Sequence, residues 1–433
     1  MSAEKPTGHL AINSHTTIAL SDEYGAQHYQ RLGFVVQRAK DSYLWNPEGE
    51  KAFDGLGAYA TDYWGHCWDV PVQALIRSLI DPSSQMDLTS NVVYTVPYAE
   101  FCKTIHEFFP GFDRVLAKSD GGSVTGSVVN AFRLHAEKRR IKNPEFIVYE
   151  HCFHGRDTIF QSLYRGMKTK WPTMVAVPRD PRAVEAAINK NTVGIFVETH
   201  LGEGGPIFDH DGSLYTAVHE IAKKYDIWRV DDDIQGGLYR CGDRSTCEKF
   251  GSQYRPDAAT YAKALGGGVF PVSVLVGTQA FMEVFKEGTD GSTFGGCPQA
   301  CSVAIAVMKD MMAHPLGTRA WEIGDRFVRN LSGIPYVTVE NEGALVSLVI
   351  DGIKSAWPLS HEMVSGNHGR PRAVIKPGHV YGGKAYMRIA VPMGTTTDDM
   401  IDYYSTKTIR PILEQTSEMI DRSSRDVPID ISF

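Results

Sequence analysis

Short apolar runs alternate with amphipathic stretches between about residues 75 and 310. The runs at 145–149, 193–197 and 272–276 have the length and composition of buried strands. Between them, residues 213–225 carry apolar side chains at helical spacing along one face, the pattern of an amphipathic helix. Strands that alternate with helices predict a largely parallel sheet with helices on both faces.

The pattern changes after about residue 311, where longer helical stretches and a few strands, such as 344–350 and 386–390, predict a smaller α+β domain. Residues 43–49 have the composition of a turn between two short strands. We therefore expect three parts. Residues 1–70 form an N-terminal segment that contributes to the small domain and the active site, 71–310 a large domain, and 311–433 a small C-terminal domain.

Composition narrows the class of protein. The formal net charge is −7 and no dense tract of Lys and Arg is present, so nucleic acid is not an expected partner. No stretch has the length and apolar character of a membrane span, and the N-terminus has no apolar leader, so we expect a soluble cytoplasmic protein. The seven cysteines form no CxxC pair, which fits free thiols in a reducing compartment, and no metal site is expected.

Lys263 and Asp232 are the most informative candidates for chemistry. Lys263 precedes a glycine run at 266–268, where a lysine can approach a bound aldehyde closely, and Asp232 ends an apolar run, where a carboxylate can face the nitrogen of a heterocycle. Together they predict a pyridoxal 5′-phosphate (PLP) site, with Lys263 as the Schiff-base residue and Asp232 as the partner of the pyridinium nitrogen. Taken alone, the Lys263 motif also fits a surface lysine beside a turn, and the Asp232 motif also fits acidic residues that cap a helix.

Other candidates follow further apolar runs, because ligands of open α/β sheets bind at the carboxyl ends of strands. Gly121 and Gly122 precede a helix expected to begin near Thr125, and their N–H groups can bind a phosphate. Phe153 can stack on a planar ring, and Ser292 and Thr293 in the glycine-rich segment 291–296 offer hydroxyls to the phosphate. The alternative for Gly121 and Gly122 is an ordinary turn, that for Phe153 is a core aromatic residue, and that for segment 291–296 is a flexible loop.

In combination these motifs resemble the class III (ornithine/ω-amino acid) aminotransferases, PLP-dependent enzymes of fold type I, and most closely the ornithine aminotransferases among them. The matching blocks are 232–238, 263–268 and 291–296. The resemblance implies an α/β fold with a mostly parallel sheet in the large PLP-binding domain, and a homodimer with composite active sites. It places Gln235 near the phenolic oxygen of the PLP ring and Phe153 against that ring, and it implies that segment 291–296 reaches the phosphate across the dimer.

The resemblance also implies a substrate pocket. It places Tyr59 at the α-amino end of an ornithine-like substrate, Arg156 at its α-carboxylate, and Glu203 where a glutamate shields a second arginine, here Arg388. With Arg388 neutralised the pocket accepts a terminal amine, and once the pair opens Arg388 binds an α-carboxylate in a bidentate manner. A surface salt bridge is the alternative for Glu203 and Arg388.

The chain also departs from the family pattern. Segment 121–126 lacks two acids that usually follow the phosphate turn, and four further positions differ: Thr199, Leu201, Asp233 and Cys297 stand in place of proline, glutamine, glutamate and asparagine. None of these changes removes a contact that the resemblance assigns to PLP. They concern the substrate and the reaction type.

These features predict a PLP-dependent aminotransferase that moves the terminal amino group of an ornithine-like basic amino acid to a 2-oxo acid. The first alternative is a PLP-dependent racemase, epimerase, lyase or cyclase that acts on a basic amino acid, because the fate of the carbanion depends on small displacements of the base. A catalytically silent binding protein of the same fold is a third interpretation, and the Lys263–Asp232 pair argues against it.

Overall fold

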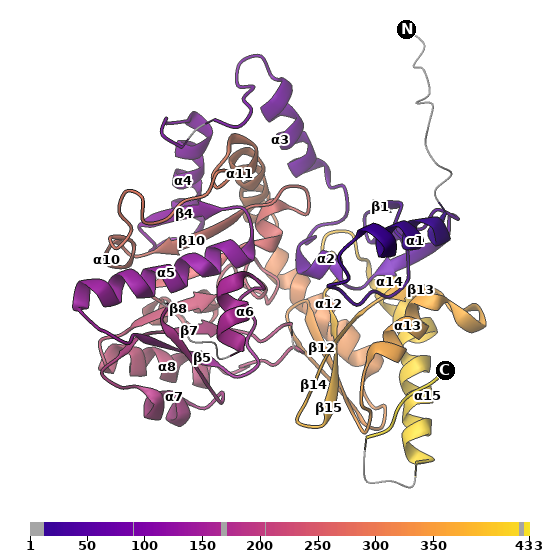
Figure 1. Cartoon of the computed structure of the whole chain (residues 1–433). Helices are drawn as coiled ribbons and strands as arrows, with labels where there is room; N and C mark the ends of the chain where they lie inside the picture. The colour runs from indigo at the N-terminus through magenta and orange to yellow at the C-terminus, as the bar shows by residue number, and fades with distance from the viewer. Residues whose placement is uncertain (1–12, 90, 166–170, 204, 424–427) are drawn as a thin grey trace.

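The computed structural model describes residues 13–433 apart from 90, 166–170, 204 and 424–427 (Figure 1). Residues 1–12, the start of the predicted N-terminal segment, in which no apolar leader is expected, lie outside the described residues. None of the helices within the described ranges combines the length and apolar composition needed to cross a bilayer. All seven cysteines are described, and they are free thiols.

A seven-stranded sheet lies at the centre of the larger part of the molecule, with the strand order β4-β10-β9-β8-β7-β5-β6. The strands are β4 (Arg114–Lys118), β5 (Glu145–Tyr149), β6 (Thr173–Val177), β7 (Thr192–Glu198), β8 (Trp228–Asp232), β9 (Ala258–Tyr261) and β10 (Ser273–Gly277). The neighbours from β9 to β6 are parallel, and β10 is antiparallel to both of its neighbours. The predicted, largely parallel sheet is confirmed.

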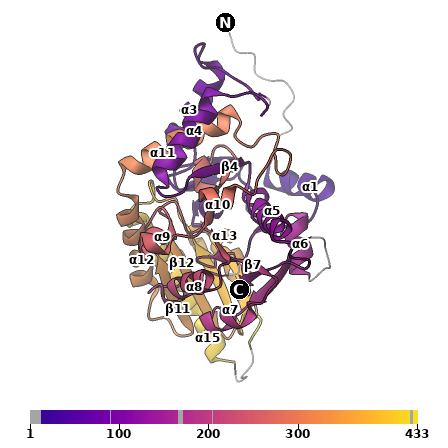
Figure 2. The same cartoon turned by 90° about the vertical axis from the view of Figure 1, so that its left-hand side faces the viewer.

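Helices cover both faces of this sheet. They are α3 (Asp69–Ile80), α4 (Val96–Phe108), α5 (Gly121–Arg139), α6 (Thr158–Tyr164), α7 (Pro181–Ala187), α8 (Ser213–Lys224), α9 (Thr246–Phe250), α10 (Gln279–Met282) and α11 (Pro298–Ala313). On β5, Phe146 and Val148 share a core with α5, whereas Ile147 and Tyr149 share another with α7 and α8. This alternation follows from the two-residue period of a strand. Figure 2 shows α5 on one side of the sheet and α8 and α11 on the other.

The start of α5 differs from the sequence-based expectation. The helix begins at Gly121 rather than near Thr125. Asp120 explains the early start, because its side chain accepts a hydrogen bond from the backbone N–H of Ser123 at 2.9 Å and so caps the first turn. The glycines therefore lie inside the first turn, where their N–H groups have no partner within the helix.

The smaller part contains two four-stranded sheets. The first sheet has the strand order β11-β12-β15-β14 and is antiparallel throughout. Its strands are β11 (Val337–Glu342), β12 (Leu345–Asp351), β14 (Lys376–Tyr381) and β15 (Lys384–Ile389). The second sheet joins β1 (Arg38–Lys40), β2 (Tyr43–Trp45) and β3 (Lys51–Asp54) to β13 (Arg372–Val374), which is parallel to β3. Residues 43–45 of the predicted turn form β2, and the turn itself, at 46–50, connects β2 to β3. Strands from both ends of the chain thus share one sheet.

Helices α12 (Leu316–Leu331), α13 (Trp357–Ser365), α14 (Asp398–Tyr404) and α15 (Arg410–Asp421) complete this part, with α1 (Ser14–Tyr24) and the short α2 (Gly57–Ala60) near the N-terminus. Figure 1 shows the β14–β15 hairpin and α2 on the side that faces the large sheet. The small part therefore brings residues from both ends of the chain to the edge where the parallel strands end.

Candidate active site

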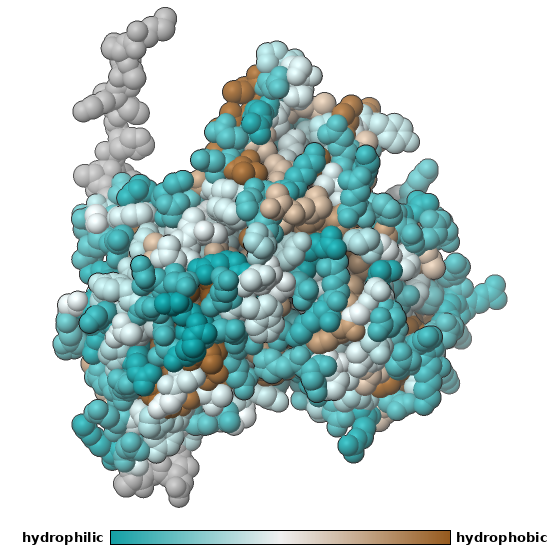
Figure 3. All heavy atoms as spheres, turned by 180° about the vertical axis from the view of Figure 1, so that it is seen from behind, coloured by the Kyte–Doolittle hydropathy of each residue, from teal (hydrophilic) through white to brown (hydrophobic). Residues whose placement is uncertain are grey.

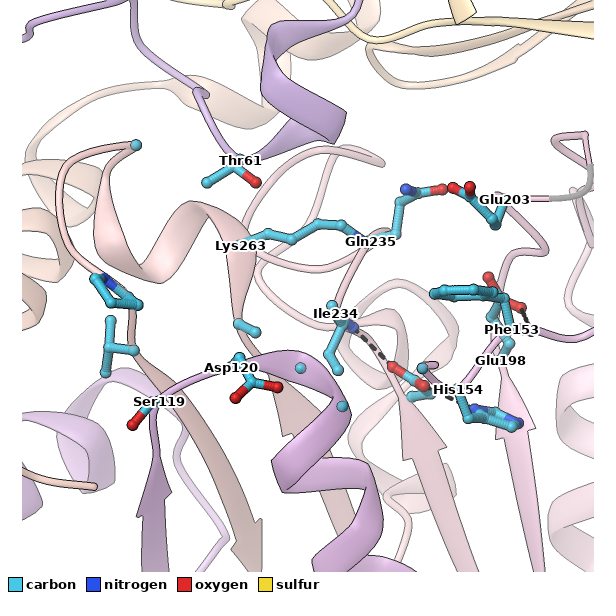
Figure 4. Close-up of a pocket in the computed structure, with 18 of the residues that line it drawn as sticks. Thr61, Ser119, Asp120, Phe153, His154, Glu198, Glu203, Ile234, Gln235 and Lys263 are labelled. Carbon is cyan, nitrogen blue, oxygen red and sulfur yellow. Dashed lines mark hydrogen bonds and ion pairs between the residues drawn. The ribbon is translucent and has the colours of Figure 1, made fainter. Parts of the chain in front are cut away.

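A cavity of about 440 Å³ lies at the carboxyl ends of the parallel strands (Figure 4). The segments that follow β4, β5, β7, β8 and β9 all contribute to its wall, as expected for a binding site in an open α/β sheet. The candidate residues among them are Gly121, Gly122, Phe153, Glu203, Asp232, Gln235 and Lys263. The structure thus brings together seven of the predicted site residues.

Lys263 extends across this cavity toward Gln235 (Figure 4). It follows β9 by two residues and begins a short 3₁₀ turn, and its backbone has a positive φ of 44°. Burial lowers the pKa of its amine to about 8, and Arg388 acts in the same direction against the opposing carboxylates of Asp232 and Glu203. A substantial fraction of Lys263 is therefore neutral near physiological pH, the form of an amine that attacks an aldehyde.

Asp232 is buried at the end of β8, and both of its carboxylate oxygens are oriented. His154 Nδ1 lies 2.7 Å from Asp232 Oδ2, and the backbone N–H of Ile234 donates to Oδ1 at 3.2 Å (Figure 4). The imidazole of His154 stacks on Phe196 with ring centroids 4.0 Å apart, which fixes its plane. Asp232 is thus held as a buried carboxylate facing the cavity.

The two acids beside Asp232 are engaged elsewhere. Asp231 pairs with buried Arg229 at 2.9 Å and accepts a hydrogen bond from the hydroxyl of Tyr215. Asp233 accepts hydrogen bonds from Thr246, at its backbone N–H and its hydroxyl. Because side chains alternate along a strand, only the middle acid of the three faces the cavity.

The opposite end of the cavity is formed by the first turn of α5. Gly121 and Gly122 line it, and the N–H groups at the start of this 19-residue helix are of the kind that bind anions. Gly155 packs against the same turn with a positive φ of 120°, and a Cβ atom there would lie 2.9 Å from Gly122 Cα. The close approach keeps this end of the cavity narrow and requires glycine at position 155.

Ser292 and Thr293 do not line this cavity. They lie in the segment before α11, where Asn91 donates a hydrogen bond to the carbonyl oxygen of Ser292 at 2.7 Å and Ser292 Oγ accepts one from Gly295. Ser292 instead borders a separate surface cavity together with Tyr94 and Lys118. Within one chain, therefore, the described structure leaves these two residues apart from Lys263.

The end of the cavity predicted to hold the substrate contains Glu203, with Arg388 in contact with it. Arg388 is 1% exposed, and its Nη1 lies 3.4 Å from Glu203 Oε2, 2.9 Å from Gln235 Oε1 and 3.0 Å from the carbonyl oxygen of Gly202. Burial alone would raise the pKa of Glu203, but Arg388 and Lys376 outweigh it and hold that pKa below its ordinary value. Glu203 lines the cavity and Arg388 lies behind it.

Arg156 and Tyr59 lie at the same end and are more exposed. Arg156 has a side chain that is 46% exposed, with its guanidinium 3.7 Å from Glu203 Oε1 and 5.6 Å from the centre of the Phe153 ring. Tyr59 has a positive φ of 61° and is 43% exposed. Burial raises the pKa of Tyr59, as does the nearby charge of Glu203. The other three predicted substrate residues are thus grouped around Glu203.

Three residues with functional positions were missed in the sequence. They are His154, which orients Asp232; Glu198, which ends β7 and accepts hydrogen bonds from the N–H groups of Phe153 and Gly202; and Lys376, which contacts Glu203. Burial, assisted by Asp232, raises the pKa of Glu198 to about 8. Glu198 directly follows the apolar run 193–197 and His154 lies in the segment after the run 145–149, a signal that could have found them. Lys376 has no comparable signal.

The residues of the cavity fit PLP. A lysine amine with a lowered pKa, a buried carboxylate and a helix N-terminus provide the three contacts required by its aldehyde, its ring nitrogen and its phosphate. When bound, PLP supplies an electron sink for the negative charge that develops beside the reacting amine. The fold and this donor set define a PLP-dependent enzyme of fold type I.

Comparisons with known proteins agree. The family model described as Aminotransferase class-III matches residues 24–351. An ornithine aminotransferase of Saccharomyces cerevisiae is 29% identical over 420 residues, which cover 90% of this chain and 96% of that relative. An ornithine aminotransferase of Halalkalibacterium halodurans is 32% identical over 335 residues, 75% of this chain and 82% of that relative. The solved structure of the ornithine aminotransferase of Toxoplasma gondii has a TM-score of 0.83 at 26% identity, over 95% of this chain and 96% of that one.

The chain belongs to the class III aminotransferases. The predicted family, fold type and cofactor are confirmed, and the protein is a PLP-dependent aminotransferase. The roles of the individual site residues stay predictions.

Proposed function

We propose that this enzyme transfers the terminal amino group of ornithine, or a closely related basic amino acid, to a 2-oxo acid. The similarity to ornithine aminotransferases supports this choice of substrate. The observation that carries it is the pairing of Glu203 with buried Arg388, while Arg156 is left half exposed. Such a pocket offers the half-exposed guanidinium of Arg156 to a carboxylate far from the reacting amine.

In the donor reaction Arg156 binds the α-carboxylate and Tyr59 contacts the α-amino group, so that the distal amine reaches Lys263. In the acceptor reaction Glu203 leaves Arg388, which then binds the carboxylate next to the keto group. An arginine fork fixes the orientation of that carboxylate by two parallel hydrogen bonds. The pairing of Arg388 with Glu203, or its release, thus selects which end of the substrate reacts.

Lys263 and Asp232 carry the chemistry. With PLP bound, the Nζ atom of Lys263 would remove and return a proton at the reacting carbon of the substrate, and a pKa of about 8 suits both directions near neutral pH. Asp232, held by His154 at 2.7 Å, keeps the ring nitrogen of the cofactor protonated. Phe153 would contact the cofactor ring, and Gly121 and Gly122 would bind its phosphate.

We also propose a cytoplasmic homodimer in which Ser292 and Thr293 of one chain complete the phosphate site of the other. An apolar surface supports it. Residues at the end of α3 and just before and within α4 are unusually exposed for their type: Ile80 65%, Val92 90%, Val93 55% and Val96 70%. Figure 3 shows apolar side chains at the top of the molecule, over α3 and the segment that leads to α4. Exposed patches of this kind are typical of protein interfaces.

Isotope transfer tests the proposed reaction. Purified enzyme with PLP receives 2-oxoglutarate and ornithine labelled with ¹⁵N at the terminal amine, and mass spectrometry follows the label. The label should appear in glutamate, and Lys263→Ala should give none. Transfer of an α-¹⁵N label instead, or retention of both nitrogens in a racemised or cyclised product, would contradict the proposal. Lysine and N-acetylornithine, tested in parallel, define the accepted length of the donor.

A further inference from the structure

Three cations surround the single carboxylate of Glu203. Its Oε1 lies 3.1 Å from Lys376 Nζ and 3.7 Å from Arg156 Nη2, and its Oε2 lies 3.4 Å from Arg388 Nη1. The side chains of Lys376 and Glu203 are 15% and 14% exposed, so this contact is largely shielded from water. Of the three, the lysine makes the shortest ion pair.

The register of the small sheet builds this contact into the fold. Lys376 on β14 is the direct cross-strand partner of Arg388 on β15, so both side chains project from the same face. Like charges placed directly opposite each other destabilise a sheet, unless a counter-ion lies between them. Burial and Arg388 both lower the pKa of Lys376, and Glu203 opposes them. Glu203 therefore lies between two cations that the register of the sheet places side by side.

A second cavity gives Glu203 room to move. It has a volume of about 170 Å³ and shares Glu203 and Phe153 with the main cavity. Its wall contains His379 and Tyr381 from β14, the strand that carries Lys376, and Tyr386 from β15. Figure 4 shows Glu203 beside Gln235 at the end of the main cavity, and the second cavity lies on its other side.

We propose that Lys376 is a positioning residue for the choice of substrate: it holds the Glu203 carboxylate at the side cavity after Glu203 has left Arg388. The inference rests on the proposed exchange between a terminal-amine donor and a 2-oxo acid acceptor. Without Lys376, a shielded carboxylate that leaves Arg388 has no close counter-ion, and an unpaired buried charge is costly. Arg156 is a poorer substitute, because it is farther from Glu203 and is assigned to the substrate carboxylate.

The test measures the two half-reactions of the holoenzyme separately by stopped-flow absorbance of the cofactor. Lys376→Met should lower kcat/KM for 2-oxoglutarate about tenfold, mainly through a higher KM. This factor is the scale of a typical coupling between two sites. The rate of the ornithine half-reaction should stay within about twofold of that of the unmodified enzyme. Lys376→Arg should restore the acceptor reaction, because it keeps the charge. Lys384→Met on the same hairpin is the matched control, since Lys384 pairs with Asp351 and not with Glu203.

Equal losses in both half-reactions, or no change in either, would overturn the proposal. A double variant adds a check: once Glu203→Ala has removed the carboxylate, Lys376→Met should have no further effect on the acceptor. If ornithine does not react with the unmodified enzyme, the proposed donor is wrong, and Lys376 is then tested by binding of glutarate, an unreactive dicarboxylate. Glutarate binding that is weaker in Lys376→Met supports the role of Lys376, and unchanged binding refutes it.

Discussion

Arg156 offers the most direct test of how the substrate is oriented. If it binds the α-carboxylate of the donor, Arg156→Ala leaves that carboxylate without a partner in the closed pocket. Two unit charges 4 Å apart interact by about 4 kcal/mol near a protein surface and by about 1 kcal/mol in water. Because the Arg156 side chain is 46% exposed, we expect an intermediate value, a loss of about 2–3 kcal/mol of transition-state stabilisation. This loss corresponds to a decrease of roughly 30- to 150-fold in kcat/KM for the donor.

The assay compares donor and acceptor half-reactions in Arg156→Ala, Arg156→Lys and Arg388→Ala. Arg156→Lys keeps the charge but loses the planar fork, so its activity should lie between that of the alanine variant and that of the unmodified enzyme. Arg388→Ala should reduce the acceptor reaction more than the donor reaction. Arg182→Ala, which removes an exposed arginine on α7, is the control and should change neither.

One result would refute this orientation. If Arg156→Ala leaves ornithine turnover untouched and Arg388→Ala abolishes it, the α-carboxylate is bound by Arg388 and the α-amino group is the one that reacts. The racemase, epimerase, lyase or cyclase alternative would then be the better description of the reaction.

Four other outcomes are expected. Lys263→Ala should abolish turnover and retain some non-covalently bound PLP, and borohydride reduction with peptide mapping of the unmodified enzyme should label Lys263 and no other lysine. Asp232→Asn should reduce kcat by about 10²- to 10³-fold with little change in PLP affinity, because Asp231 and Asp233 are held by other partners; near-normal kcat would contradict this. When a Lys263→Ala chain is mixed with a Ser292→Ala/Thr293→Ala chain, about a quarter of the activity should return if dimers form at random and the sites are composite. No recovery despite subunit exchange would argue against shared sites. The rate at which the apoenzyme takes up PLP should rise with pH and level off above about pH 8. The reason is that burial lowers the Lys263 pKa to about 8 and only the neutral amine reacts. A rate that does not change between pH 6.5 and 9 would contradict that lowered pKa.

Local patterns in the sequence determined the type of fold. The apolar runs at 145–149 and 193–197 became β5 and β7, and the helical pattern at 213–225 became α8, because burial on both faces of a sheet or on one face of a helix requires such spacing. The motifs at Asp232 and Lys263 predicted PLP for a similar reason. Asp232 ends β8 and Lys263 follows β9 by two residues, so the order of elements alone brings them to the same edge of the sheet.

The start of α5 shows the limit of such patterns. Gly121 and Gly122 are poor helix formers, which placed the expected start near Thr125. The capping hydrogen bond of Asp120 outweighs that preference, and the helix begins at Gly121.

Tertiary structure alone decided how the substrate end is assembled. Glu203 lies 185 positions before Arg388 in the chain, and their contact depends on how the small sheet packs against the large one. Lys376 gave no signal in the sequence because its partner is set by the register of β14 and β15, in which a shift of one residue would turn its side chain to the other face. The sequence therefore determined the cofactor and the family, and the packing of two distant segments decided which charges surround Glu203.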